Sequence, residues 1–131
     1  MQIIGNPPDR AVKFSVRGEP RSKQRPRVTK RGAYTPKETL EAEKIILEAW
    51  LALEEGTFEH QVVIDINFYN ATKNRRDIDN MAKLVLDALN GYAYYDDFHV
   101  VGLNLRKTFT SKAKARTDVR IVEVISWPYE S

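Results

Sequence analysis

The sequence contains no cysteine, only two histidines and no long apolar run, and each of these absences excludes a class of protein. Without cysteine, the chain forms no disulfide and offers no thiolate ligand for zinc. His60 and His99 are too few and too far apart for a zinc motif. There is no apolar stretch long enough to span a membrane and no signal-like N-terminus, so we expect a cytoplasmic protein with no membrane partner. Any metal site must therefore rely on carboxylates.

Acidic residues are scarce in one stretch of the chain and abundant in the next. Residues 17–31 contain seven cations and a single acid, Glu19, whereas residues 38–59 are rich in glutamate. Because the net charge is only +3, the distribution of charge says more than its sum. We expect a basic face and an acidic face. The basic stretch is interpreted as a phosphate-binding arm, with a solvated loop as the alternative.

The length and composition are those of one ordinary globular domain. With 131 residues, 42% of them hydrophobic, the chain can bury one core, and we expect a single domain over residues 1–131 with a flexible lead-in at residues 1–10. Alternating apolar residues predict strands at residues 11–16, 61–69, about 99–109 and 118–126. Apolar residues at helical spacing predict helices at residues 36–54 and from 77 or 79 to 89. This order predicts an α/β (α+β) domain with a small mixed sheet of about four strands and two main helices.

The first predicted helix has a clear start signal and two apolar stripes. Thr35 is the predicted N-cap, with Pro36 at the first helical position and Glu38 closing a capping box. The first stripe consists of Ala42, Ile45, Ile46, Ala49 and Leu53, with Trp50 at its margin. The second, on roughly the opposite side, consists of Leu40, Leu47 and Leu51. One stripe can cover the sheet, and the second is explained by a subunit interface or by another contact within the chain.

The residues that point most directly to chemistry lie around the start of the second helix, in residues 75–83. In the middle of a regular helix Asp77 and Asp79 would point roughly 200° apart. At a helix start, Asp77 can stay in extended backbone while Asp79 enters the first turn, so that both carboxylates can face one ion. An N-cap at Asp77 and a favourable first-turn acid at Asp79 explain the pair equally well.

Two further features favour a site. Lys83 stands one turn after Asp79, where it either stabilises negative charge on a phosphate or pairs with Asp79 and Asp87. The pair Asp96-Asp97 can return to the same region after a helix of about three turns. Two carboxylates and a lysine beside arginines are typical of Mg²⁺-assisted phosphate chemistry, because Mg²⁺ takes oxygen ligands. Asp65, on a predicted strand, is either a further carboxylate of the site or a salt-bridged strand residue.

The order of these residues resembles a known family, the RusA-type Holliday junction resolvases. The resemblance covers about residues 64–107 and is carried by residues 76–80, Lys83, residues 86–90, Asp96-Asp97 and residues 99–101. The earlier Gly18-Glu19-Pro20 and the basic residues 23–27 are similar to an N-terminal motif of a phage and bacterial branch of the family. This motif departs from the proline- and asparagine-rich opening of the best-known members, and the departure bears on junction geometry and sequence preference.

The resemblance implies a function and a set of site residues. It implies metal-binding carboxylates at Asp77, Asp79 and Asp97 and a catalytic lysine at Lys83, with Asp96 the less favoured neighbour. It further implies a homodimer that places two Mg²⁺-dependent sites, with Mn²⁺ as a substitute ion, on a four-way DNA junction. Such a dimer cuts symmetrically related strands to leave 5′-phosphate ends, and acts in DNA recombination and repair.

Several cations are candidates for contacts with the DNA backbone. They are Arg21, Lys23, Arg25, Arg27, Arg75, Arg76 and Lys107. Two other functions remain compatible with the sequence: a nuclease specific for flaps or replication forks, and a junction-binding protein of the same fold without catalysis.

Overall fold

A computed structural model of the chain describes residues 10–24 and 27–124. The strands are β1 (Ala11–Arg17), β2 (Arg27–Thr29), β3 (Gly32–Tyr34), β4 (Gln61–Asn70), β5 (Val100–Phe109) and β6 (Arg116–Val124). The helices are α1 (Lys37–Leu51) and α2 (Ile78–Leu89), with short 3₁₀ turns η1 (Asp97–His99) and η2 (Lys112–Lys114). The predicted α+β class, with two main helices and a mixed four-stranded sheet, is confirmed. Most of the predicted lead-in lies outside the described residues.

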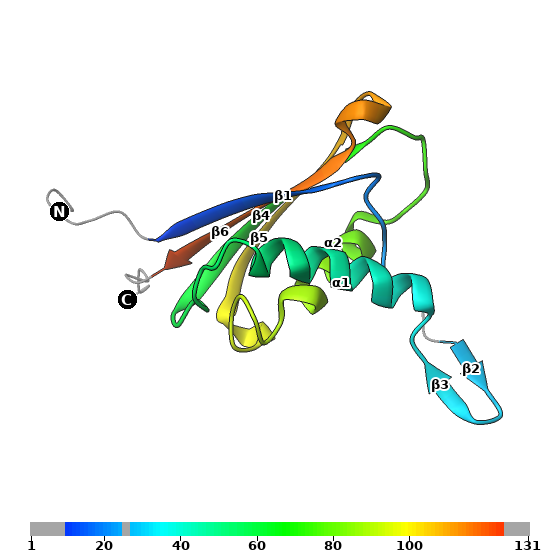
Figure 1. Cartoon of the computed structure of the whole chain (residues 1–131), viewed down its shortest axis with the longest axis horizontal. Helices are drawn as coiled ribbons and strands as arrows, with labels where there is room; N and C mark the ends of the chain where they lie inside the picture. Colours follow the sequence, from blue (N-terminus) through cyan, green and yellow to red (C-terminus); the bar gives the residue numbers. More distant parts are fainter. Residues whose placement is uncertain (1–9, 25–26, 125–131) are drawn as a thin grey trace, which may run out of the picture.

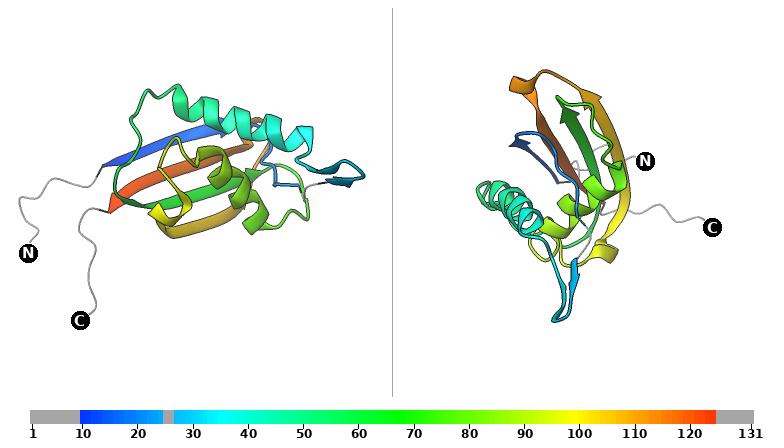
Figure 2. Two further views of the ribbon diagram at one scale, coloured as in Figure 1. Left: turned by 90° about the horizontal axis from the view of Figure 1, so that it is seen from below. Right: turned by 90° about the vertical axis from the view of Figure 1, so that its right-hand side faces the viewer.

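The main sheet has the strand order β1-β6-β4-β5. Strands β4 and β5 are parallel, and the other two pairs are antiparallel. A parallel pair needs a crossover connection, which α2 provides between β4 and β5. Figures 1 and 2 show both helices on the same face of the sheet. Among the described residues, no helix is both long and apolar enough to cross a membrane.

Strand β4 shows how the two faces of the sheet differ. Val62, Ile64, Ile66 and Phe68 alternate along the strand and are buried against the helices. Asp65 points to the opposite face, where Asn104 Nδ2 donates to its Oδ1 at 2.6 Å and Arg120 Nη1 lies 3.4 Å from its Oδ2. Asp65 is therefore a paired residue of the polar sheet face, and the sheet separates it from α2.

Helix α1 begins one residue later than the capping pattern predicts. Pro36 occupies the N-cap position, and its carbonyl oxygen accepts the hydrogen bond from the Leu40 amide at 3.2 Å. Because this carbonyl already starts the helical ladder, Thr35 lies outside the helix. No side-chain hydrogen bond caps α1 within the described part of the chain. The predicted Thr35 cap and its capping box with Glu38 are therefore wrong.

The far end and the buried face of α1 also differ from the prediction. The helix ends at Leu51, and Glu54 adopts a left-handed conformation with φ of 54°, which is typical of residues that terminate helices. Trp50, predicted at the margin of the buried stripe, is only 1% exposed and lies between Phe14 and Phe58, with ring centroids 6.0 and 6.2 Å away. A ring of this size needs the deepest position, so the helix turns its Trp50 face toward the sheet.

The predicted stripes of α1 are consequently divided between core and surface. Ala42 and Ile46 are buried, as predicted, but Ile45 and Leu53 are exposed. In the second stripe Leu47 packs partly against the core, and two members remain exposed: Leu40 and Leu51.

Residues 27–34 form a hairpin, β2–β3, that the sequence did not indicate. It projects away from the sheet and helices at the start of α1 (Figure 1). Each strand has three residues, too few to show an alternating pattern. Arg25 and Pro26, which precede the hairpin, lie outside the described residues.

Candidate active site

The start of α2 places the two central aspartates as the sequence predicted. Asp77 is the N-cap residue in extended backbone, with φ of −73° and ψ of 135°, and Asp79 lies in the first turn. The Asp77 carbonyl accepts from the Met81 amide at 3.0 Å. Over the described residues, its carboxylate makes no capping hydrogen bond to the helix. Asp77 thus holds the position of a cap without using its side chain as one.

The apolar stripe of α2 fixes which side of the helix is left for chemistry. The predicted stripe is confirmed, because all five of its members are buried: Met81, Leu84, Val85, Ala88 and Leu89. Burial of this face turns the residues at positions 79, 83 and 87 to the opposite side.

A cavity of about 200 Å³ lies beside this polar side of α2. Its polar lining consists of Asp79, Lys83, Asp87, Tyr94 and Asp97. Its apolar lining consists of Ala82, Leu86, Val100, Leu103 and Leu105. Segments separated in the sequence by the whole of α2 therefore bring acids and one lysine to the same cavity.

The turn η1 explains which of the two adjacent acids reaches the cavity. Asp96 is the N-cap of η1, and its Oδ1 accepts from the Asp97 amide at 2.7 Å. This bond uses the Asp96 carboxylate, whereas Asp97 lines the cavity. Asp97 itself begins the 3₁₀ turn.

Tyr94 shows that negative charge is concentrated here. Its hydroxyl donates to the Leu86 carbonyl at 2.7 Å. Burial raises the pKa of Tyr94, and the nearby charges of Asp97 and Asp87 raise it further. The phenol is therefore a neutral hydrogen-bond donor that holds the loop after α2 against the helix.

Two lysines share Asp87. Lys83 Nζ lies 3.8 Å from Asp87 Oδ2, and Lys23 Nζ forms an ion pair and a hydrogen bond with the same oxygen. Lys23 is also paired with Glu43 on α1 at 3.5 Å. Burial lowers the pKa of Lys23, but its contacts with Asp87 and Glu43 outweigh this effect, so the net pKa is raised. Lys23 therefore ties the basic arm to both helices, while Lys83 keeps 62% of its side chain exposed.

Glu19 holds the loop that leads into Asp77, a role that the sequence did not indicate. Its Oε1 accepts from the Ala71 amide at 2.8 Å, and its Oε2 accepts from the Thr72 hydroxyl at 2.7 Å. Arg76 Nη1 lies 3.8 Å from Oε2. Partial burial raises the pKa of Glu19, but these hydrogen bonds and the charge of Arg76 outweigh it and lower the pKa below its usual 4.5. The available signal was its position as the single acid of the basic stretch.

The structure gathers some of the predicted DNA-binding cations and separates others. Arg75 is exposed on the loop before α2, and Lys107 Nζ donates to the Arg76 carbonyl at 2.9 Å. Arg75 and Arg76 therefore lie on the segment that leads to Asp77, and Lys107 contacts this segment. Arg21 is exposed at the edge of a second cavity, between the end of β1 and the helices. Lys23 is paired with Asp87 and Glu43. The remaining two lie in or before the hairpin: Arg25, outside the described residues, and Arg27, in β2.

The expected metal ligands are only partly brought together. Within residues 10–24 and 27–124, no three acidic or histidine side chains form a cluster that could hold an ion. Asp79 and Asp97 line one cavity, but Asp77 is not among the described residues that line it. The carboxylate oxygens fit Mg²⁺, which often takes one or two carboxylates and completes its shell with water and phosphate oxygens. The three-ligand assignment stays a prediction.

Carboxylates that can hold a metal ion and an exposed lysine that can stabilise negative charge are groups suited to phosphodiester cleavage. The family model for endodeoxyribonuclease RusA matches residues 17–122, which include the whole cavity. The chain therefore belongs to the RusA family of endodeoxyribonucleases, which resolve Holliday junctions. A comparison with curated proteins found no match.

Proposed function

We propose that this protein is a Mg²⁺-dependent endonuclease that resolves four-way DNA junctions by symmetric cleavage, in DNA recombination and repair. The observation that carries the proposal is the cavity in which Asp79, Lys83 and Asp97 meet. These residues come from α2 and η1, and the family match spans both elements.

The carboxylates and the lysine have separate roles in the proposed reaction. Asp79 and Asp97 would hold the ion, with Asp77 as the third predicted ligand at the helix start. When bound, Mg²⁺ polarises the scissile phosphate and lowers the pKa of the attacking water. Lys83 stabilises the negative charge that develops on the phosphate oxygens. Attack of water on phosphorus breaks the bond to the 3′ oxygen, which leaves as a 3′-hydroxyl, and the phosphate remains on the 5′ end.

Two features of the chain support this assignment of Lys83. Asp87 is shared with Lys23, so the negative charge of Asp87 is divided between two ammonium groups. Lys83 is also the more exposed of the two, with 62% of its side chain accessible against 24% for Lys23. A phosphate that enters the cavity can therefore reach Lys83 without displacing a buried ion pair.

The DNA backbone would run past the loop that precedes α2. Arg75, Arg76 and Lys107 lie around this loop, and phosphate contacts of this kind position a duplex without reading its sequence. Two copies of the chain are needed to cut both related strands. The exposed Leu40 and Leu51 of α1 supply the apolar surface on which we propose that the homodimer forms.

The proposal is tested by substrate choice. Full-length protein is incubated with labelled four-way junction, flap and linear duplex, in Mg²⁺, Mn²⁺ or EDTA. Paired nicks on the junction that need either ion, with ligatable 5′-phosphate ends, are the expected result. Preferred cutting of the flap would support a flap- or fork-specific nuclease, and binding without nicking would support a non-catalytic junction-binding protein.

A further inference from the structure

The β2–β3 hairpin has a fixed turn that presents two cations. Gly32 has φ of +115°, a conformation that favours glycine. The Thr29 hydroxyl donates to the Gly32 carbonyl at 3.1 Å and accepts from the Arg31 amide at 3.2 Å. Lys30 and Arg31 are exposed at the turn, so the hairpin carries a doubly positive tip.

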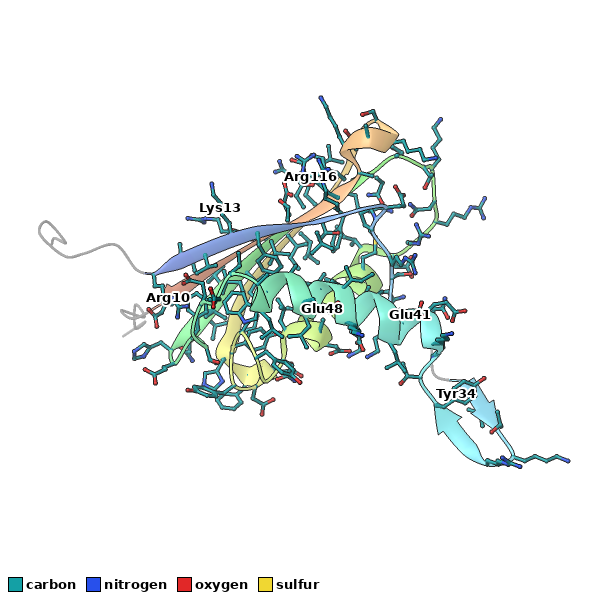
Figure 3. The ribbon with its side chains drawn as sticks, viewed as in Figure 1. Arg10, Lys13, Tyr34, Glu41, Glu48 and Arg116 are labelled. Atoms are coloured by element: carbon teal, nitrogen blue, oxygen red, sulfur yellow. The ribbon has the colours of Figure 1, made fainter. Side chains whose placement is uncertain are left out.

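The hairpin also exposes one aliphatic and one aromatic side chain. Val28 is 83% exposed and Tyr34 is 49% exposed. Figure 3 shows Tyr34 where the hairpin joins the rest of the molecule. An isolated two-stranded hairpin is at best marginally stable in water, so a projecting ribbon of this kind gains from a partner that covers it. Residues 20–37 contain no acid, and the partner that fits this charge is a polyanion.

The base of the arm is joined to both helices of the candidate site. The Lys23 amide donates to the Asn80 carbonyl in the first turn of α2 at 3.0 Å. The Gln24 amide donates to the Thr39 hydroxyl on α1 at 3.2 Å. The arm that leads into the hairpin is therefore attached to the first turns of the two helices, one of which carries Asp79 and Lys83.

We propose that the β2–β3 hairpin is a DNA-binding ribbon that enters a groove of the duplex arm next to the cleaved phosphate. A two-stranded ribbon fits the major groove. Lys30 and Arg31 contact phosphates. Val28, which pairs with Ala33, lies on the face that packs against sugars and base edges, and Tyr34 lies on the opposite face of the ribbon. Strands of three residues extend roughly 10 Å, which is about three base-pair steps. The inference rests on the proposed function, because it assumes that branched DNA occupies the cavity.

The test measures junction binding in EDTA, so that it does not depend on cleavage. The affinity of full-length protein for a labelled four-way junction is determined across a range of salt for the wild type and for Lys30→Ala with Arg31→Ala. Loss of two phosphate contacts from each protomer, four in the proposed dimer, should reduce the slope of log affinity against log salt by about 4 and weaken binding by more than about tenfold near physiological salt. The matched control removes two exposed cations elsewhere, Lys13→Ala with Lys112→Ala, and should leave the slope nearly unchanged.

A second variant keeps the tip intact. Val28→Asp places a negative charge on the ribbon at a position that is exposed in the free protein, so it should weaken junction binding without unfolding the chain. Hydroxyl-radical footprints should lose protection in two symmetry-related stretches of duplex arm with either hairpin variant. Salt slopes and footprints that are equal for the wild type and the hairpin variants would overturn the inference. A control variant that lowers the salt slope as much as the hairpin variants do would overturn it as well. So would a hairpin variant that weakens binding because it converts a dimer to a monomer. If the wild type binds and cuts the junction in Mg²⁺ while the variants match it, the inference alone fails; if the wild type does not cut the junction, the proposed function fails.

Discussion

Lys83 is the cation that the cavity offers to a phosphate. It stands one turn after Asp79, faces the cavity and remains mostly exposed. Its contact with Asp87, at 3.8 Å, is an exposed i,i+4 pair of a kind that contributes only tenths of a kcal/mol. The position is therefore of little use to stability and well suited to stabilising a charged transition state.

The variant Lys83→Gln separates these two roles. Loss of the ammonium should lower the single-turnover cleavage rate by about 10²–10³-fold, as removal of one preorganised charge-stabilising group does in other active sites. Junction affinity should fall by less than about tenfold, the share of one phosphate contact. Equal losses in rate and affinity would show that Lys83 serves binding alone.

The lowered pKa of Glu19 predicts how the free energy of unfolding depends on pH. Its folded-state pKa is lowered, so the stability that it contributes is present above its unfolded pKa near 4.5 and is lost as the pH falls through the lower folded value. Glu19→Gln should reduce the free energy of unfolding by about 1.5 kcal/mol at neutral pH, since hydrogen bonds to a charged group are replaced by weaker ones. Urea unfolding should show the difference in unfolding free energy between variant and wild type narrowing as the pH falls below 4.5.

The control for this experiment is Glu59→Gln, at an exposed acid before β4. It should change the unfolding free energy by less than about 0.5 kcal/mol both at neutral and at acid pH. If the loss of unfolding free energy caused by Glu19→Gln stays constant from neutral to acid pH, this would contradict the proposal that the charged Glu19 carboxylate holds the loop before α2.

Local sequence predicted some of these residues and not others, for a physical reason. The positions of Asp77 and Asp79 follow from the start of α2, and the side occupied by Lys83 follows from its apolar stripe, because both depend on neighbours within two turns. The hydrogen bonds of Glu19 to the loop before α2 join residues more than fifty positions apart, and the pairing of Lys23 with Asp87 spans 64 positions. Such contacts depend on how β1 and the arm are placed by the fold.

At the level of elements, too, features set by neighbours in the sequence were predicted, and features set by distant contacts were not. The order of the long strands and helices was recoverable, because each carries a sustained period of two or 3.6 residues. The phase of α1 was not, because the volume of Trp50 sets it through contacts with Phe14 and Phe58 on other elements. The hairpin was missed because three-residue strands have no period.

Helix α1 carries the prediction about assembly. Leu40 and Leu51 are 53% and 52% exposed, and we propose that the partner chain covers them. Leu40→Lys with Leu51→Lys should convert a dimer to a monomer in sedimentation at micromolar concentration. Unfolding of the monomer should change little, because both side chains lie on the surface.

The matched control is Ile45→Lys, since Ile45 is equally exposed, at 52%, but lies outside the stripe of Leu40, Leu47 and Leu51. This variant should remain dimeric. A wild type that sediments as a monomer would remove the assembly proposal and leave the cavity assignment untouched.

Across the whole molecule, the sheet divides two polar surfaces with different uses. The helix side holds the cavity, the clamped loop and the base of the basic arm. The opposite side holds Asp65 in a network with Asn104 and Arg120, where its carboxylate is already paired. The sequence predicted the mixed sheet but not the strand order β1-β6-β4-β5. Asp65 and Asp97 lie on different surfaces because side chains alternate along β4 and both helices cover the same face of the sheet (Figure 2).

The central claim is that the cavity between α2 and η1 is the nuclease site, and two aspartate variants test it directly. Asp97→Asn and Asp65→Asn make the same chemical change on opposite faces of the sheet. Cleavage of a labelled four-way junction in Mg²⁺ should be lost with Asp97→Asn, while its junction binding in EDTA is retained, and Asp65→Asn should cut like the wild type. Undiminished paired nicking by Asp97→Asn, or loss of nicking by Asp65→Asn in a folded protein, would contradict the account.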